Sequence, residues 1–426
     1  MEQTGRQEVG ARPIDQGPGD KHDEILLAAA QCFSRKGFDA CSLDDIARIV
    51  GLHKASLYHY VNSKQDILYQ CLERSFGDIG PAEEYLRDES VPVMDRIRVF
   101  FRALGKAQSS PYGRSLIAVG AQGLGHDPGS RIRTFRRRLD YSFRAVLEEG
   151  IDLGEIRPCR VPVVSAMIFG AFNWIGTWHN PDGKLPLDRV IDDFLSIVAD
   201  GLGSDPAHWL SDGGKASTAA GRGLSVPEEA SIDPADKRYM ILRSAADVFA
   251  ERGYEGTSLK DIAARVNLHK ASLYHYMSGK SDLLVQCLET SFANLREVAE
   301  VAECADVAPL DRLAFFFRHL VAAQCSDFGR CVNLIRPEVL PEVDAQRVIS
   351  FKQKLDRIVR DLLRQAMERG EMRQMHTTTA AAFLFGASNW VPHWHRPDRD
   401  PPLDVISDSF LRLFLAGLVA RNPQGR

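Results

Sequence analysis

Two octapeptides with the sequence HKASLYHY contain the side chains of this chain whose types and spacing best suit contacts to nucleic acid. In the first copy, a short helix would expose Lys54, Ala55, Ser56, Tyr58 and His59 on one face. A lysine suits a guanine edge or a phosphate, a serine hydroxyl donates and accepts, and an alanine methyl contacts the thymine methyl group. Tyrosine and histidine side chains suit phosphate oxygens. This combination predicts a surface that reads a DNA groove.

The residues before this octapeptide predict two helices and a tight turn that would position it. Apolar residues over 25–33 recur on one helical face, and Gly37 suits the position just after a helix. Ser42, with an acidic residue three positions later, forms a near capping box that starts a second helix. That helix stops at Gly51, and the matching position in the second copy is Asn267. Glycine and asparagine readily adopt the left-handed conformation, so a sharp turn is expected here.

A short helix over about 54–60 would then bury Leu57 and Tyr60, and Lys64 would start the next helix. There its charge and the helix N-terminal amides would hold a phosphate. A helix-turn-helix places its second helix in the DNA major groove. The alternative is a packed helical corner with a polar rim. Local charge does not decide between them, because residues 21–76 contain seven basic and seven acidic residues.

The pattern occurs twice in the chain at a constant offset of 216 residues, since HKASLYHY fills both 53–60 and 269–276. Comparison of residues 22–76 with 238–292 gives 30 identities in 55 positions without a gap. Packing alone would keep the buried positions alike but not the exposed ones. The identical exposed faces therefore favour a binding role for both copies.

The rest of each copy predicts helices and no alternating strand pattern, so the expected fold class is all-α. Amphipathic segments follow at about 93–108, 129–150, 161–178 and 187–202, with counterparts 216 residues later. The expected organisation is a disordered tail over 1–20, a helix-turn-helix domain over 21–76, a helical domain over 77–202, a flexible linker over 203–236, and a second pair of such domains over 237–292 and 293–421. The linker is rich in Gly, Ser, Ala, Asp and Pro, and its extended reach of about 110 Å lets the copies pack side by side.

Composition excludes several classes of protein. The 426 residues are 44% hydrophobic and 26% charged with a net charge of -4, so the chain is globular and any DNA binding must come from a local patch. The 8 cysteines form no C-x-x-C pair, and residues 1–20 have no signal-peptide core. A reducing cytoplasm with free thiols is expected. The uncharged stretch 161–178 approaches the length of a membrane span, but Pro162 and Asn173 favour a buried interface helix.

Motifs of enzymes, metal sites and cofactor sites are missing from the sequence. It contains no G-x-S-x-G, H-E-x-x-H, P-loop or dinucleotide fingerprint. We therefore expect no catalytic residues, no metal, no cofactor and no membrane partner.

At residues 51–68, GLHKASLYHYVNSKQDIL resembles the core signature of TetR-type transcriptional regulators, and residues 267–284 match as well. The resemblance implies a three-helix DNA-binding domain followed by a helical ligand-binding and dimerisation domain in each copy. The DNA-contact residues expected are Ser42, Lys54, Ala55, Ser56, Tyr58, His59 and Lys64, and Ser258, Lys270, Ala271, Ser272, Tyr274, His275 and Lys280. The chain departs from the family pattern at His53 and His269, where a hydroxyl N-cap is usual, and at Cys41, where a threonine is more typical. It also contains two modules where the usual regulator has one.

The segment 169–186, FGAFNWIGTWHNPDGKLP, resembles the penultimate helix of TetR subfamilies, which pairs across the dimer. An effector cavity would lie between the middle helices, although each apolar candidate also suits a core. The cavity residues expected are Phe100, Phe101, Leu104, Phe135, Phe143, Phe169, Phe316, Phe317, Phe351 and Phe385. The basic run RIRTFRRR (131–138) is either a solvated face or a site for an acidic effector. Resemblance to subfamilies that sense CoA thioesters implies an acyl-CoA or an apolar acid.

These features together predict a sequence-specific DNA-binding transcriptional regulator that acts as a ligand-released repressor. Its double-stranded DNA partner would be an inverted-repeat operator, and its two modules would pair in cis. Pairing of whole chains as a homodimer stays open. The alternative is a helical ligand-binding or protein-interaction protein that does not bind DNA.

Overall fold

The computed structural model describes residues 21–38, 40–119, 126–205, 236–252, 254, 256–304, 306–329, 340 and 342–420. The expected tail over 1–20 and the linker residues 206–235 lie outside the described part of the chain. Within that part the secondary structure is helical, and the only β-type pairings are two isolated bridges. The prediction of an all-α fold is confirmed.

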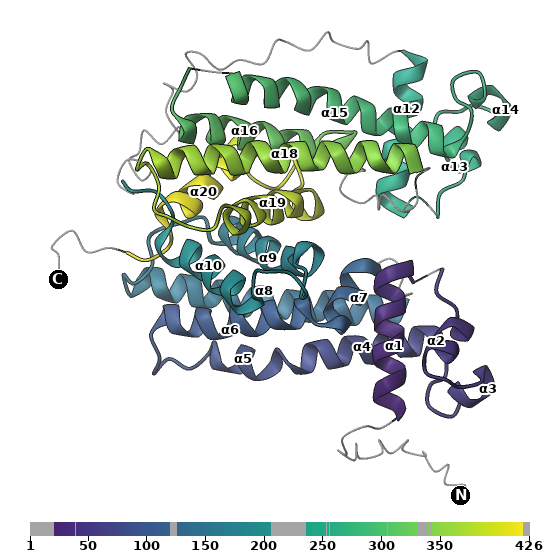
Figure 1. Ribbon diagram of the computed structural model, residues 1–426, viewed down its shortest axis with the longest axis horizontal. Helices are drawn as coiled ribbons and strands as arrows, with labels where there is room; N and C mark the ends of the chain where they lie inside the picture. Colours follow the sequence, from purple (N-terminus) through teal and green to yellow (C-terminus); the bar gives the residue numbers. More distant parts are fainter. Residues whose placement is uncertain are drawn as a thin grey trace, which may run out of the picture.

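The structure contains two modules of similar helix order, module 1 over 21–205 and module 2 over 236–420 (Figure 1). Module 1 comprises α1 (Lys21–Lys36), α2 (Leu43–Ile49), α3 (Lys54–Leu57), α4 (Lys64–Gly77), α5 (Gly80–Tyr85), α6 (Val93–Ser109), α7 (Pro111–Val119), α8 (His126–Asp152), α9 (Val161–Trp178) and α10 (Leu187–Asp200). Module 2 comprises α12 (Lys237–Arg252), α13 (Leu259–Arg265), α14 (Lys270–Leu273), α15 (Lys280–Cys304), α16 (Pro309–Cys325), α18 (Glu342–Glu368), α19 (Thr377–Trp394) and α20 (Leu403–Ala416). The four long helices expected after each helix-turn-helix are present.

The modules differ where the helix-turn-helix segment joins the rest of the chain. Module 1 breaks its helix between α4 and α5, at Gly77 and the pair Gly80–Pro81. Proline lacks an amide hydrogen and glycine is a poor helix former, so this sequence favours a break. Module 2 has Ala293, Arg296 and Glu297 at these positions, and α15 continues through them. The helix-turn-helix segment of module 1 consequently has a hydrophobic core of its own, whereas that of module 2 shares the main core.

The two modules meet along a seam formed by α9, α10, α19 and α20, which lie at the centre of the molecule (Figure 1). α9 and α19 cross at two glycines. A Cβ atom placed on Gly170 would lie 2.5 Å from the Cβ of Trp390, and one placed on Gly386 would lie 2.6 Å from the Cβ of Trp174. Only glycine lets the two helices approach this closely. α9 is also the one described helix that is long and apolar enough to cross a membrane, and its packing against α19 agrees with the predicted interface helix.

Backbone hydrogen bonds across the seam are reciprocal. The Arg157 amide donates to the Leu418 carbonyl at 2.8 Å, and the Arg373 amide donates to the Leu202 carbonyl at 2.8 Å. Arg373 lies 216 residues after Arg157, and Leu418 lies 216 residues after Leu202, so the two hydrogen bonds are equivalent. A surface that pairs with its own counterpart in this way is the mark of a two-fold interface. The two modules therefore contact each other through equivalent segments.

Candidate nucleic-acid interface

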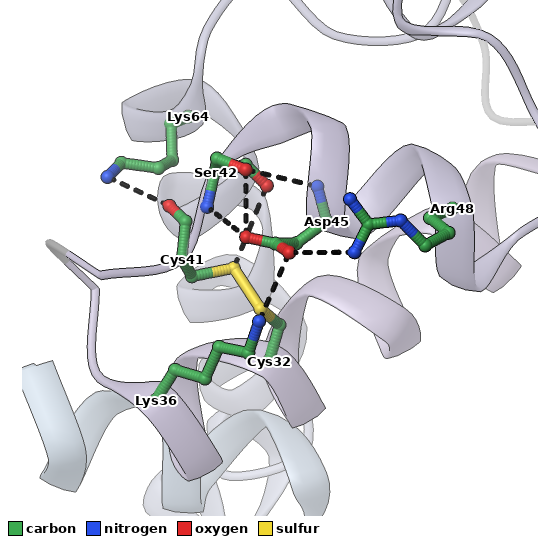
Figure 2. A network of polar contacts seen from close by, with 7 residues as sticks. All are labelled: Cys32, Lys36, Cys41, Ser42, Asp45, Arg48 and Lys64. Atoms are coloured by element: carbon green, nitrogen blue, oxygen red, sulfur yellow. Dashed lines mark hydrogen bonds and ion pairs between the residues drawn. A yellow bond between two sulfur atoms is a disulfide. The ribbon is translucent and has the colours of Figure 1, made fainter.

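Ser42 and Asp45 fix the start of α2 through a complete capping box (Figure 2). The Ser42 hydroxyl accepts a hydrogen bond from the Asp45 amide at 3.1 Å, and the Asp45 carboxylate accepts one from the Ser42 amide at 3.0 Å. Lys36 and Arg48 also approach this carboxylate, at 3.1 and 3.2 Å. The backbone hydrogen bond from Ser42, then its hydroxyl and Lys36, hold the pKa of Asp45 well below its usual range. Ser258 caps α13 in the same way.

The turn between the two helices has the predicted left-handed residue. Gly51 has a φ of 68°, and Asn267 in module 2 has a φ of 53°. The helix that follows is shorter than the expected 54–60, because α3 ends at Leu57. Residues 58–60 continue as a turn in which the Tyr60 amide bonds to the Leu57 carbonyl at 2.9 Å, three residues back. The His53 side chain makes no capping hydrogen bond, as its departure from the hydroxyl pattern suggests.

The predicted contact face of α3 points to solvent. Lys54, Ala55, Tyr58 and His59 are exposed, and Ser56 is half-buried. Module 2 has the same pattern of exposure: Ser272 is half-buried, and the exposed residues are Lys270, Ala271, Tyr274 and His275. The capping residues Ser42 and Ser258 are exposed as well. Leu57 is fully buried as predicted, but the prediction that Tyr60 faces inward is wrong, because 39% of it is exposed. The helices that contain these faces, α3 and α14, lie at the same end of the molecule, at the right of Figure 1.

Lys64 differs from its predicted role. Its amino group donates to the carbonyls of Phe38 and Cys41 at 2.8 and 3.1 Å and lies 4.3 Å from the centre of the Phe38 ring. Lys280 does the same in module 2, with the Tyr254 carbonyl at 2.8 Å and the ring of that residue at 4.2 Å. The ammonium group of each lysine therefore interacts with carbonyl oxygens and with the face of an aromatic ring. These lysines tie the N-terminus of α4 or α15 to the loop before the capping serine instead of reaching outward to a phosphate.

The charge around the two contact faces is not the same. Lys54 pairs with Asp44 at 2.8 Å, and the hydrogen bond and charge of this carboxylate raise the pKa of Lys54. The residue of module 2 that corresponds to Asp44 is Lys260. A negative charge beside one contact face is therefore replaced by a positive charge beside the other, so module 2 presents the more basic surface.

Cys32 and Cys41 form a disulfide that joins α1 to the residue before the Ser42 cap (Figure 2). Their Cα atoms lie 6.1 Å apart, and both residues are buried. The expectation of free thiols is wrong for this pair. The sequence contains no motif for it, because the two residues meet only when the loop folds back on α1. Module 2 has Val248 and Thr257 at these positions and joins them by a hydrogen bond from the threonine hydroxyl to the Val248 carbonyl at 3.3 Å.

Each module also has a cavity between its middle helices. The first cavity, in module 1, has a volume of about 350 Å³, and the second, in module 2, about 340 Å³. Of the predicted cavity residues, Leu104, Phe135 and Phe169 line the first cavity, and Phe351 and Phe385 line the second. The prediction is wrong for Phe100, Phe101, Phe143, Phe316 and Phe317, which are fully or almost fully buried in the core. None of them lines either cavity, and the rings of Phe101 and Phe143, for example, meet edge to face at 4.8 Å.

The cavities have walls that the sequence did not predict. Trp390 and Trp394 of module 2 line the first cavity, and Trp174 and Trp178 of module 1 line the second. The segment 169–186 was expected to pair across an interface, but it was not expected to form a cavity wall. Among the described residues, no group of three metal-binding side chains is arranged to hold an ion.

The arginines of the basic run over 131–138 have different surroundings. Arg136 and Arg137 line the first cavity. Arg138 instead forms an ion pair with Glu83 at 2.8 Å. The side chain of Arg131 lies outside the described part of the structure.

Comparison with known families identifies the two modules. The family described as bacterial regulatory proteins, tetR family, matches residues 25–71 and again 241–287. The tetracyclin repressor-like C-terminal domain matches residues 90–202 and again 306–418. This chain belongs to the TetR family. It is a helix-turn-helix DNA-binding transcriptional regulator in which both TetR domains occur twice.

Several known proteins are similar to parts of this chain. The HTH-type transcriptional repressor KstR2 of Rhodococcus jostii is 26% identical over 197 residues, which is 44% of this chain and 94% of that protein. The icaADBC biofilm-operon negative regulator IcaR of Staphylococcus aureus is 40% identical over 58 residues, 14% of this chain and 31% of that protein. A crystal structure of AibR with isovaleryl coenzyme A and operator DNA is 27% identical, covering 41% of this chain and 95% of that one, with a TM-score of 0.37. KstR2 thus matches a little under half of the chain, as a protein with one module should.

Proposed function

We propose that this chain is a ligand-released repressor in which one molecule covers one complete inverted-repeat operator. The observation that carries the proposal is the pair of exposed faces on α3 and α14, which are identical in sequence and lie at the same end of the molecule (Figure 1). Two identical readers related by a pseudo-two-fold axis require half-sites in inverted orientation. In this arrangement module 2 takes the place of the second chain of an ordinary dimer, and the regulator acts on DNA in the cytoplasm.

The direct test is the mass of the complex on DNA that contains a single palindrome. Native mass spectrometry should give one chain per palindrome at the lowest concentration at which binding occurs, because tethering raises the effective concentration of the second reader to about the millimolar range. DNA with one scrambled half-site is the control and should bind more weakly. Two chains per palindrome would show that modules pair between chains.

The contribution of the contact faces is tested by replacing Lys54 and Lys270 with alanine. Both side chains are exposed, so helicity and melting should not change, whereas operator affinity should fall. For phosphate contacts, the slope of log affinity against log salt should decrease by roughly one per lysine. Unchanged affinity and slope would remove these lysines from the interface. Absence of operator binding by the unmutated protein would favour a ligand-binding protein without DNA binding.

The effector that we propose for release is an apolar acid or its CoA thioester. The first cavity supports this, because Phe135 and Phe169 provide an apolar wall and Arg136 and Arg137 provide guanidinium groups for an anion. Such a compound should raise the melting temperature, because it binds only the folded state, and should weaken the DNA complex. A panel of such compounds that gives neither effect would exclude this ligand class.

A further inference from the structure

Asp44 lies at the edge of the contact face of α3. Its carboxylate is 2.8 Å from the Lys54 amino group, and the side chains of Lys54 and Asp44 are 48% and 55% exposed. Asp44 belongs to the first turn of α2, and the capping box of Ser42 fixes the start of that helix. A DNA base pair that approaches Lys54 therefore also approaches the Asp44 carboxylate.

Module 2 has a lysine, Lys260, at the equivalent position. Lys260 belongs to the first turn of α13, which starts with the same capping box, and Asn267 provides the same left-handed turn before α14. Lys260 is exposed, and neither it nor Lys270 has a salt-bridge partner among the described residues. One position at the edge of the contact face therefore changes from a negative charge in module 1 to a positive charge in module 2.

The other charge differences between α2 and α13 are neutralised within their own modules. Arg48 of α2 has an alanine as its counterpart, but it is paired with Asp45 at 3.2 Å. Arg265 of α13 has an isoleucine as its counterpart, but it is paired with Glu251 at 2.7 Å. Among the charged residues at the positions where these two helices differ, Lys260 alone lacks an ionic partner in the described structure. Its ammonium group is therefore available to DNA.

The side chains of Lys260 and Asp44 suit opposite base edges in the major groove. A lysine ammonium only donates hydrogen bonds, and guanine presents the acceptors N7 and O6. A carboxylate only accepts hydrogen bonds, so it is repelled by these guanine acceptors and suits the amino group of cytosine. Lys260 therefore favours guanine at the base pair that it faces, whereas Asp44 disfavours guanine and favours cytosine at the equivalent base pair.

We infer that the operator of this chain is an inverted repeat with unequal half-sites, and that the chain binds it in one orientation. The bases that α3 and α14 read are the same in both half-sites, because the two helices have the same sequence. At the base pair beside them, module 2 places Lys260 on a guanine and module 1 places Asp44 on a cytosine. This inference rests on the proposed function, because it specifies the DNA that the two contact faces bind.

The first experiment uses the full-length protein to select binding sites from a pool of random-sequence duplex DNA. The unmutated protein should enrich inverted repeats whose half-sites differ by guanine against cytosine at one equivalent position. Asp44→Lys should enrich a symmetric repeat with guanine in both half-sites, and Lys260→Asp should enrich one with cytosine in both. Each variant has the residue that the other module has at that position, so the fold should be retained. A symmetric repeat enriched by the unmutated protein would overturn the inference.

Binding titrations on the selected operator then determine the orientation. Lys260→Ala should lower the affinity about tenfold, and so should replacement of the guanine–cytosine pair by adenine–thymine in the guanine half-site. The two changes together should cost no more than either alone, because they remove the same contact. Lys354→Ala is the matched control, since it removes an exposed lysine from α18, and it should leave the affinity unchanged.

The outcomes separate this inference from the proposed function. If Lys260→Ala lowers the affinity equally on operators with and without the guanine, Lys260 contacts a phosphate, which does not distinguish bases, and the inference is wrong. Selection of a symmetric operator would likewise refute only this inference. Failure of the unmutated protein to enrich any DNA sequence would instead refute the repressor function.

Discussion

The glycine crossing between α9 and α19 gives a quantitative prediction for Gly170→Ala. An alanine Cβ would lie 2.5 Å from the Cβ and 2.9 Å from the Cγ of Trp390. The nearest atom is attached directly to the α19 backbone, so rotation of the tryptophan cannot relieve the clash. The helices must separate by about 1 Å to restore ordinary contact, and contacts along the seam are lost.

The expected magnitude follows from two opposing effects. Alanine favours a helix over glycine by about 0.5–1 kcal/mol. Overpacking of a close-packed contact costs about 1–3 kcal/mol, and here the backbone itself must move, which favours the upper part of that range. Gly170→Ala should therefore destabilise the protein by about 1–2 kcal/mol. Gly77→Ala, in α4, is the matched control, since a Cβ atom placed on Gly77 would have no neighbour within 4 Å and the substitution should be neutral or stabilising by up to about 1 kcal/mol.

Urea unfolding followed by circular dichroism measures both variants, with the free energy taken from the midpoint at constant slope. The reciprocal variant Gly386→Ala should resemble Gly170→Ala, because its Cβ would lie 2.6 Å from the Cβ of Trp174. The double variant should lose less than the sum, because the first substitution already separates the helices. If Gly170→Ala is as stable as Gly77→Ala, the close crossing and the seam derived from it are wrong.

Three further predictions concern the DNA-binding domain of module 1. Asp44→Asn should remove a negative charge beside the Lys54 contact and raise operator affinity several-fold; an unchanged affinity in binding titrations would contradict this. Because the folded-state pKa of Asp45 lies below its ordinary value of 3.8, its capping contribution is present above that value and is lost as the pH falls further, so Asp45→Asn should remove this acid-side change in stability. Reduction of Cys32–Cys41 should destabilise this domain by roughly 2–3 kcal/mol, and a Cys41→Thr variant should melt identically with and without dithiothreitol.

Features that depend on neighbouring residues were predictable from the sequence. The Ser42 capping box and the left-handed turn at Gly51 and Asn267 depend on a few consecutive residues, and both are present. The long helices follow from their apolar periodicity. The length of α3 was overestimated, because its apolar spacing is compatible both with an α-helix and with a turn whose hydrogen bonds span three residues.

Features that arise from packing between distant segments were not predictable. Lys64 was expected to reach outward, but its partners are carbonyls more than twenty residues earlier in the chain. The tryptophan walls come from the other module, so no pattern within one module shows them. Phe100 and Phe101 are apolar and would suit the wall of a ligand cavity. The sequence does not show, however, which faces of the helices border a cavity and which pack in the core.

The reciprocal hydrogen bonds of Arg157 and Arg373 have a genetic consequence. In a dimer of identical chains every mutation appears in both halves. A chain from a defective allele can also pair with a normal chain and inactivate the resulting mixed dimer. If the halves pair within one chain, a mutation appears once and a defective chain does not pair with a normal chain, so such alleles should be recessive. Each half is also free to change alone, and the contrast between Asp44 and Lys260 shows that it has done so. The two halves can then evolve to recognise an operator with unequal half-sites, which a dimer of identical chains cannot do because its two halves always change together.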